Sequence, residues 1–134
     1  RYVDHVMGSF MLLRREAIGL QPLFDERFFL YPDDLDLRKR LHDAGFRSYF
    51  DAGVQVSHAG GGTSNQIRAR RLFYSLQSRQ QYWKKHFSTA GYMWLQLCAI
   101  TLEPLARIGQ AILKGSSAQV AEVLKAYRLW LLGK

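Results

Sequence analysis

The 134-residue sequence contains one cysteine, Cys98, so no disulfide can form within a single copy of the chain. A lone cysteine suits a reducing compartment, and we expect a cytoplasmic location. The amino terminus has no basic stretch followed by an apolar core, which argues against a signal peptide. The first residue is Arg1 rather than methionine, which suggests a piece of a longer protein.

Long apolar runs are also missing. Residues 91–102 carry no charge, but a membrane-spanning helix needs about 20 apolar residues, so this stretch is too short to cross a bilayer. Hydrophobic residues make up 48% of the chain and charged residues 22%. This composition excludes intrinsic disorder as the default and predicts an ordered domain or part of one.

Acidic residues are scarce in the second half of the chain. Residues 1–64 contain 8 lysines and arginines against 9 acids, whereas residues 65–134 contain 11 against 2. A balanced first half is therefore joined to a strongly basic second half. Basic charge of this kind suits phosphate, nucleic acid or anionic lipid as a partner.

The pattern of apolar residues predicts short extended segments in the first half. We expect strands at residues 6–13, 46–50 and 53–57, and one helical turn at residues 14–18. An aromatic loop should occupy residues 23–31, since prolines bracket this run.

A helix is expected to begin near Asp33 or Asp34, because carboxylates are favoured at the start of a helix. Leu37 and Leu41 fall on one face and should be buried. Gly45 supplies the left-handed residue that commonly ends a helix.

A glycine-rich connector at residues 59–65 marks the boundary between two parts. We expect helices at 65–87, 88–114 and 116–132. The predicted domains are thus 1–64, which carries the acidic motif, and 65–134, a basic helical tail.

Three carboxylates crowd the predicted helix start: Asp33, Asp34 and Asp36. Charges this close repel one another unless the helix dipole, a cation or a metal offsets the repulsion. Asp34 precedes Leu37 by three residues, so its carboxylate should point inward and could act as a general base. Asp33 and Asp36 should point elsewhere and hold basic groups or the loop. An alternative is that all three only cap the helix.

Five motifs follow one another in the first half: MGSFMLLRREA (7–17), FDERFF (24–29), DDLDL (33–37), AGF (44–46) and VSH (56–58). Together they resemble the carboxy-terminal part of family-2 glycosyltransferases with a GT-A fold, especially bacterial rhamnosyl- and galactofuranosyltransferase-like members. Pro22 and Pro32 depart from the family pattern. The family's amino-terminal nucleotide-binding βα units, and the metal-binding Asp-x-Asp that belongs with them, are not in these residues.

The resemblance implies roles for particular residues. Asp34 would be the catalytic base, and His58 would be a ligand of a divalent metal, Mn²⁺ or Mg²⁺. Asp33 would orient the acceptor or support the base, and Gly8 and Ser9 would line the floor of the sugar site. A strand glycine packed against a neighbour is an equal alternative for Gly8.

The implied fold class is α/β, with α+β character in this chain: the carboxy-terminal portion of a GT-A fold with short strands, followed by a helical tail. The implied function is inverting transfer of a sugar from a nucleotide-sugar donor to a glycan or lipid-linked acceptor, in cell-envelope polysaccharide synthesis. Without the nucleotide-binding half, we expect this chain alone to be inactive.

The tail mixes basic and aromatic residues, which suits a membrane surface. We therefore expect a peripheral contact through residues 65–134 at the inner face of the cell membrane, formed by the helix at 65–87. Alternatively, its aromatic residues pack onto the first part of the chain or onto a second subunit. The residues concerned are Leu72, Phe73, Leu76, Tyr82, Trp83 and Phe87.

Two other classes of function compete with an enzyme. One is a nucleic-acid-binding helical module, suggested by the pI of about 9.9, but neither a helix-turn-helix pattern nor an RNA-stacking signature is present. The other is an oligomerisation domain, such as a homodimer, in which Trp83, Trp94 and Trp130 are buried against a partner chain. His5, His42 and His86 are assigned to the surface or to helix ends.

Overall fold

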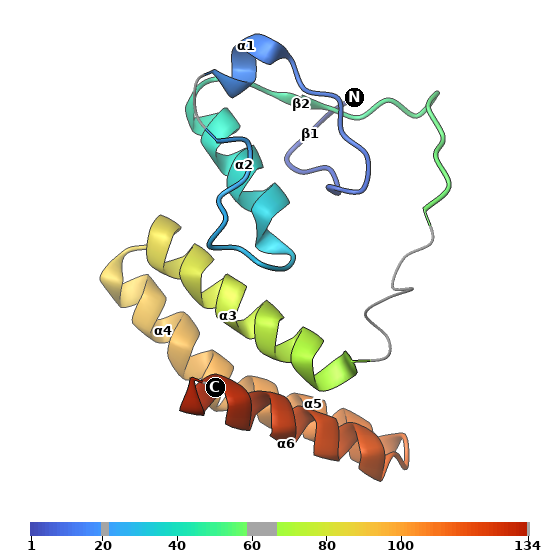
Figure 1. Cartoon of the computed structure of the whole chain (residues 1–134), viewed down its shortest axis with the longest axis vertical. Coiled ribbons are helices and arrows are strands. Elements are labelled where there is room, and N and C mark those ends of the chain that lie inside the picture. Colours follow the sequence, from blue (N-terminus) through green and yellow to red (C-terminus); the bar gives the residue numbers. More distant parts are fainter. Residues whose placement is uncertain (20–21, 59–66, 134) are drawn as a thin grey trace.

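A computed structural model describes residues 1–19, 22–58 and 67–133, which are mostly helical (Figure 1). A two-stranded sheet and two helices precede a group of four further helices. The elements in chain order are β1 (Tyr2–Val3), α1 (Arg15–Ile18), α2 (Pro32–Asp43), β2 (Ser48–Tyr49), α3 (Arg68–His86), α4 (Thr89–Ile100), α5 (Leu102–Leu113) and α6 (Ser117–Leu132).

The sheet consists of β1 and β2, which pair antiparallel with Tyr2 opposite Tyr49 and Val3 opposite Ser48. The prediction of a strand within residues 46–50 is confirmed by β2, but the strands predicted at 6–13 and 53–57 are wrong. A strand needs a hydrogen-bonded neighbour, and β1 and β2 pair only with each other among the described residues. The apolar side chain of Leu12, which suggested a buried strand, is 96% exposed.

Helix α2 has the predicted position and end. Pro32 stands in its first turn, where a missing N–H costs nothing, and is followed by Asp33 and Asp34. Gly45 has φ of +88°, which a glycine adopts without strain. The N–H of Gly45 donates to the carbonyl of His42 at 2.9 Å, and the N–H of Phe46 donates to the carbonyl of Leu41. This pair of hydrogen bonds is the Schellman motif.

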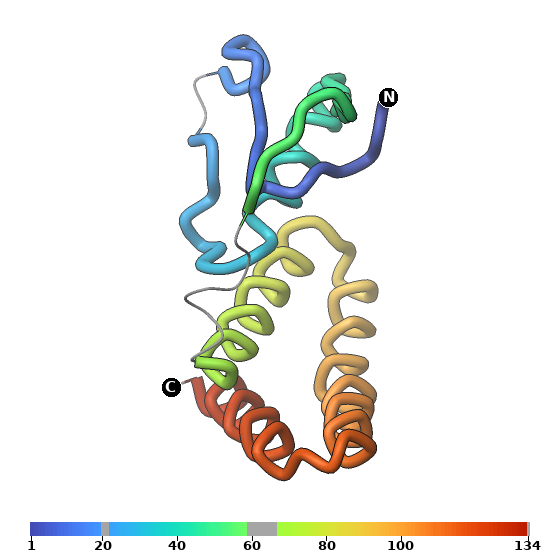
Figure 2. Tube along the Cα trace, turned by 90° about the vertical axis from the view of Figure 1, so that its right-hand side faces the viewer, coloured from blue at the N-terminus to red at the C-terminus, as the bar shows by residue number. Residues whose placement is uncertain are grey.

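Helices α3 to α6 pack side by side: α3 lies against α6 and α4, and α5 lies against α4 and α6 (Figures 1 and 2). The single helix predicted at 88–114 is two helices, interrupted at Thr101. The cause is Pro104, whose ring would clash with the carbonyl of Ile100 in a continuous helix. In the new helix Pro104 falls in the first turn, where it is tolerated.

The tail is docked on the first part of the chain through α3. The ring of Phe29 lies 4.5 Å from that of Tyr74, and the ring of Phe28 lies 6.4 Å from that of Tyr82. The backbone N–H of Leu30 donates to the hydroxyl of Ser78 at 3.2 Å. The aromatic loop predicted at 23–31 thus exists, and its contacts favour the alternative in which α3 packs onto the first part.

The three tryptophans have different environments. Trp83 is half-buried under the guanidinium of Arg79, which lies 5.0 Å from its ring, and the Trp130 N–H donates to the side chain of Gln80 at 3.2 Å. Trp94 is 65% exposed. Of these three residues, Trp94 presents the largest surface to a partner.

Candidate functional site

The Asp34 carboxylate lies in the first turn of α2 and contacts a loop that comes from near the amino terminus. Its Oδ2 accepts the backbone N–H of Gly8 at 2.9 Å, and its Oδ1 accepts the N–H of Leu35 at 2.8 Å. The side chain is 19% exposed. The structure therefore brings together two residues that the resemblance assigns to the site, Asp34 and Gly8.

This geometry leaves Asp34 able to receive a proton. A carboxylate has about four lone-pair positions, and two are used by backbone N–H groups. The N–H donors fix the orientation of the group, and its partial exposure gives a substrate hydroxyl access to the remaining lone pairs. A carboxylate with free lone pairs and a fixed orientation is the kind of group that can serve as a general base, and this role of Asp34 remains a prediction.

His5 also lies beside Asp34, with its Nε2 3.8 Å from Oδ2. This distance is longer than a hydrogen bond, so the contact is electrostatic. The assignment of His5 to the surface is incomplete, since its side chain is 35% exposed but faces the candidate base. The sequence carried no signal for this contact, because it depends on the loop after β1 folding back over α2.

The other proposed substrate residues, Asp33 and Ser9, are the sequence neighbours of Asp34 and Gly8. Asp33 is half-buried in the same first helical turn, and Ser9 is exposed in the turn that contains Gly8. Their roles in orienting an acceptor remain predictions.

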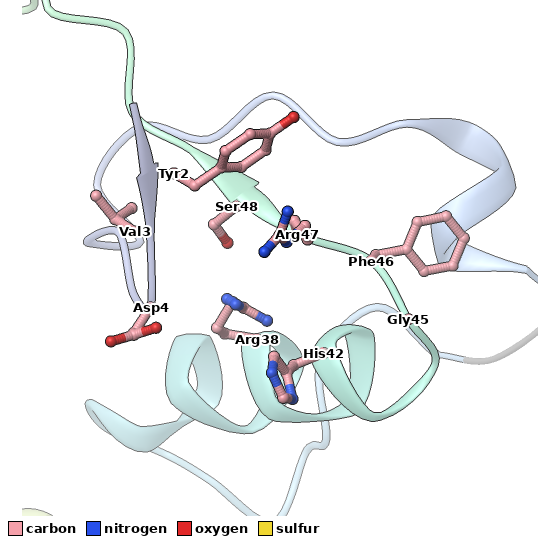
Figure 3. A pocket seen from close by; sticks show the side chains of 9 residues that line it. All are labelled: Tyr2, Val3, Asp4, Arg38, His42, Gly45, Phe46, Arg47 and Ser48. Atoms are coloured by element: carbon pink, nitrogen blue, oxygen red, sulfur yellow. The ribbon is translucent and has the colours of Figure 1, made fainter.

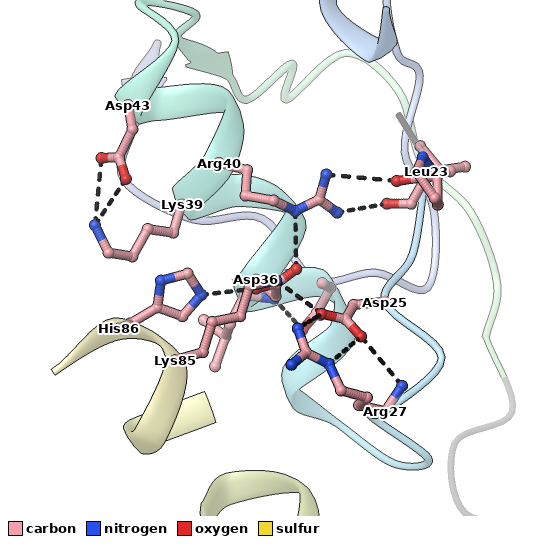
Figure 4. Close-up of polar contacts among 12 residues, drawn as sticks. Leu23, Asp25, Arg27, Asp36, Lys39, Arg40, Asp43, Lys85 and His86 are labelled. Carbon is pink, nitrogen blue, oxygen red and sulfur yellow. Dashed lines mark hydrogen bonds and ion pairs between the residues drawn. The ribbon is translucent and has the colours of Figure 1, made fainter. Parts of the chain in front are cut away.

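Asp36 points to the other side of α2. Residues two positions apart in a helix are rotated by about 200°, so Asp34 faces the Gly8 loop and Asp36 faces α3. The Asp36 side chain is fully buried and contacts the Arg40 Nε at 2.9 Å, the Lys85 Nζ at 2.6 Å and the His86 Nε2 at 2.6 Å (Figure 4). The prediction that Asp36 holds basic groups is confirmed.

The ionisation of Asp36 follows from these partners. Burial acts to raise the pKa of this carboxyl, but hydrogen bonds from Lys85, His86 and Arg40 outweigh it and hold the pKa below its ordinary value. Asp36 is therefore a buried, paired anion and is unavailable to a substrate. His86 is at the end of α3 as predicted, yet its side chain is 9% exposed and belongs to this cluster.

A second acid extends the cluster to the aromatic loop. Asp25 accepts three hydrogen bonds from Arg27, two from its guanidinium and one from its backbone N–H, and one from the Lys85 Nζ at 2.8 Å (Figure 4). The Arg27 bonds, with Lys85, hold the pKa of Asp25 well below its usual range. Arg40 in turn donates to the carbonyl of Leu23 at 2.8 Å. Lys85 thus joins α3 to both the loop and α2.

The predicted metal ligand has a different setting. His58 is exposed, and in residues 1–19, 22–58 and 67–133 no three His, Cys, Asp or Glu side chains gather in a way that could hold a metal ion. The described residues therefore do not form a metal site around His58. The predicted connector at 59–65 lies outside the described residues, and metal binding by His58 remains a prediction.

Comparison with known proteins gives a partial match. Over 58 residues the chain is 43% identical to the N-acetylglucosaminyl-diphospho-decaprenol L-rhamnosyltransferase of Mycobacterium tuberculosis, in strains CDC 1551 / Oshkosh and ATCC 25618 / H37Rv. Part of this chain is similar to a glycosyltransferase. The match covers 43% of the chain and 19% of the relative, so the chain spans about a fifth of the length of the curated relatives it matches. No protein-family model and no solved structure matches.

This similarity agrees with the broad resemblance to glycosyltransferases seen in the sequence motifs. A glycosyltransferase-like region is supported, and a mostly helical chain with one two-stranded sheet is compatible with part of such an enzyme. No helix within the described part of the chain is long and apolar enough to cross a membrane.

Proposed function

We propose that this chain is part of an inverting glycosyltransferase that transfers a sugar from a nucleotide-sugar donor to a glycan or lipid-linked acceptor in cell-envelope polysaccharide synthesis. The observation that carries the proposal is the Asp34 carboxylate, held by the Gly8 N–H at 2.9 Å within the acidic motif. The similarity to a rhamnosyltransferase that acts on a diphospho-decaprenol-linked sugar supports the substrate class.

In this mechanism Asp34 accepts the proton of an acceptor hydroxyl. As the proton leaves, the hydroxyl oxygen forms a bond to the anomeric carbon of the donor, and the bond from that carbon to the diphosphate oxygen breaks on the opposite face. Attack from the opposite face inverts the anomeric centre. Gly8 keeps the loop close enough to orient Asp34, and Asp33 lies where it can help to position the acceptor.

The different burial of Asp34 and Asp36 supports the assignment of Asp34, rather than Asp36, as the base. Asp36 is fully buried with three cationic or imidazole partners, so protonating it would leave those partners without their anion. Asp34 has backbone partners and an exposed edge, and it can gain a proton without disrupting an ionic cluster.

We also propose that the tail contacts an anionic lipid surface, through α4 and α5 rather than through α3. Large apolar side chains on these helices are 45–90% exposed. They are Met93, Trp94, Leu97, Ile100, Leu102, Leu105, Ile112 and Leu113. Such a contact would bring the site close to a lipid-linked acceptor.

The charge of the tail as a whole favours an anionic lipid surface as its partner, although α4 and α5 themselves carry only the Glu103–Arg107 pair. Residues 65–134 contain 11 basic and 2 acidic residues. Both acids are engaged inside the protein, since Glu103 pairs with Arg79 and Arg107, and Glu122 accepts the N–H of Ala69 at 2.7 Å. The tail therefore presents apolar side chains and positive charge, which an anionic bilayer complements.

The other two classes of function have less support. The comparisons point to no nucleic-acid-binding protein, and Arg79 and Lys85 are used in contacts within the chain. A second copy of the chain is the rival occupant of the α4 and α5 face, and its test is given with that of the lipid contact below.

A transfer assay tests the proposed function. The protein that contains this chain is incubated with a panel of nucleotide sugars and a short-chain prenyl diphosphate carrying N-acetylglucosamine. We expect a disaccharide product with inverted anomeric configuration. A retained configuration, or no product with any donor from a protein that binds one, would contradict the proposal.

A further inference from the structure

A pocket of about 370 Å³ lies between α2 and the two-stranded sheet (Figure 3). This volume is within the range of small-molecule sites, roughly 300–1,000 Å³. The residues that matter are Arg38 and His42 on α2, Arg47 and Ser48 at β2, and Tyr2 and Asp4 at β1. The sequence did not single out this pocket.

Arg38 is the unusual residue in this lining. Its Nε and Nη1 are buried and have no hydrogen-bond partner among the described residues. A guanidinium carries five N–H donors and stays charged, so burial without an acceptor carries a desolvation penalty that an anion would remove. Arg38 thus marks the place where an anionic group would be stabilised.

Other lining groups add positive charge to the same space. Arg47 comes from the segment before β2, and its guanidinium points toward that of Arg38 across the pocket (Figure 3). The Tyr2 ring lies 4.8 Å from the Arg47 guanidinium carbon and helps to hold it there. Asp4 is the single acid of the lining, against two arginines and His42. Two cations facing each other repel unless an anion lies between them.

The pocket adjoins the candidate base. Arg38 is four residues after Asp34, so it lies on the same face of α2 one turn further, about 6 Å along the axis. Asp4 lines the pocket, and the next residue, His5, approaches the Asp34 carboxylate at 3.8 Å. A sugar that offers a hydroxyl to Asp34 would therefore extend its other end toward Arg38.

We propose that this pocket binds the diphosphate group of a sugar substrate, with Arg38 and Arg47 as its cationic ligands. A guanidinium pairs with two phosphate oxygens at once, which suits a diphosphate better than a single carboxylate. The choice of substrate rests on the proposed function, and the position one turn from Asp34 favours the diphosphate of a lipid-linked acceptor over that of the nucleotide donor.

Binding of inorganic pyrophosphate, measured by isothermal titration calorimetry, tests the pocket without needing turnover. We expect saturable binding that weakens with salt. Arg38→Gln should weaken it at least about tenfold, because a hydrogen-bonded charge pair is lost. The matched control is Lys39→Gln, which removes one positive charge from the same helix at a residue paired with Asp43. The control should change affinity by less than about twofold.

Two further variants guard against misfolding. Arg47 is exposed, so Arg47→Gln should fold normally and still weaken binding several-fold. Arg38→Lys keeps the charge and should restore part of the affinity. Unchanged pyrophosphate binding in Arg38→Gln and Arg47→Gln would overturn the proposal. An equal loss of binding in Lys39→Gln would also overturn it, because it would indicate attraction by overall charge only.

Competition identifies the substrate that supplies the diphosphate. A short-chain prenyl diphosphate carrying N-acetylglucosamine should displace pyrophosphate at lower concentration than uridine diphosphate. The reverse order would overturn the assignment to the acceptor. Arg38-dependent binding of pyrophosphate by a protein that transfers no sugar would mean that the proposed function fails while the pocket assignment stands.

Discussion

The backbone at Gly8 approaches Asp34 so closely that a side chain has no room. A Cβ built on Gly8 would lie 2.9 Å from the Asp34 Cβ and 3.0 Å from its Oδ2. These contacts are shorter than real Cβ atoms show, and the atoms that must move belong to the candidate base. Gly8 is thus packed against a neighbour, Asp34, as the alternative for it held, although it lies in a turn and not in a strand. Its positional role, holding Asp34 in place for catalysis, is a prediction.

We predict that Gly8→Ala reduces sugar transfer by about tenfold or more, because displacing Asp34 misaligns proton transfer. The matched control is Gly109→Ala in α5, where an added Cβ meets nothing within 4 Å. The control should keep full activity and gain about 1 kcal/mol of helix stability. Transfer rates and urea unfolding measure both effects. Equal activity in Gly8→Ala and the parent protein would contradict the positional role.

The lowered pKa of Asp36 determines how the stability of the fold should depend on pH. Its pKa in the folded chain is lowered from the ordinary 3.8, so on acidification the unfolded chain takes up the proton first. The stabilisation from Asp36 is thus fully present above the ordinary pKa and is lost as the pH falls through the lower, folded one. Urea midpoints measured from pH 6 downward should decline steeply below about 4.

The variant Asp36→Asn isolates this contribution. It should destabilise the protein at neutral pH by about 3 kcal/mol, since three basic partners lose their anion. Its decline in acid should be shallower than that of the parent, with the remaining slope including Asp25, whose pKa is also lowered. Parallel declines in the two proteins would contradict the assignment.

Among helices, the contact of α3 with α2 includes a lysine that pairs with two acids. The Lys85 Nζ lies 2.6 Å from Asp36 and 2.8 Å from Asp25. We predict that Lys85→Ala lowers the free energy of unfolding by about 2–3 kcal/mol, because it leaves both acids less well paired. The neighbouring Lys84 is exposed, and Lys84→Ala should change stability by less than about 0.5 kcal/mol. Similar losses in the two variants would contradict a specific link.

Element positions were predictable where local chemistry decides them. The acids that begin α2 and Gly45 after its end gave a helix within about two residues of the observed one. Two of the three predicted strands were wrong, because strand pairing depends on segments far apart in the sequence, as β1 and β2 illustrate. The break at Thr101 could have been found, since Pro104 is incompatible with a continuous helix.

At the scale of the whole molecule, the exposed face of α4 and α5 predicts lipid binding. The double variant Trp94→Gln with Leu105→Gln should weaken binding to phosphatidylglycerol vesicles by about tenfold or more, since each buried apolar side chain contributes about 1.5–3 kcal/mol. The control is Leu12→Gln, at a residue 96% exposed in the first part of the chain. Vesicle sedimentation at low and high salt measures the effect.

Several results would remove the lipid contact. They are no sedimentation with anionic vesicles, an equal loss in Leu12→Gln, or a solution dimer that the double variant converts to monomer. The last result would assign the face to a second copy of the chain.

The division of the chain at residue 64 was predicted from the glycine-rich connector and the difference in charge, but neither could say how the two parts meet. The basic helix expected to lie on a membrane instead contacts Phe28, Phe29 and Asp36 through its own aromatic and basic residues. A mixed basic and aromatic pattern suits a lipid surface and a docked helix equally. Only the position of the acidic partners Asp25 and Asp36 distinguishes a docked helix from one that lies on a lipid surface. These acids lie more than forty residues before the α3 residues that they contact.

The most direct test of the account is the transfer rate of Asp34→Asn in the protein that contains this chain. With the base removed, transfer should fall by about 100-fold to 10,000-fold, while donor binding and the urea midpoint stay near those of the parent. Asp43→Asn, which removes an exposed acid from the same helix, should keep nearly full activity. Full transfer by Asp34→Asn would contradict the assignment of Asp34 as the base.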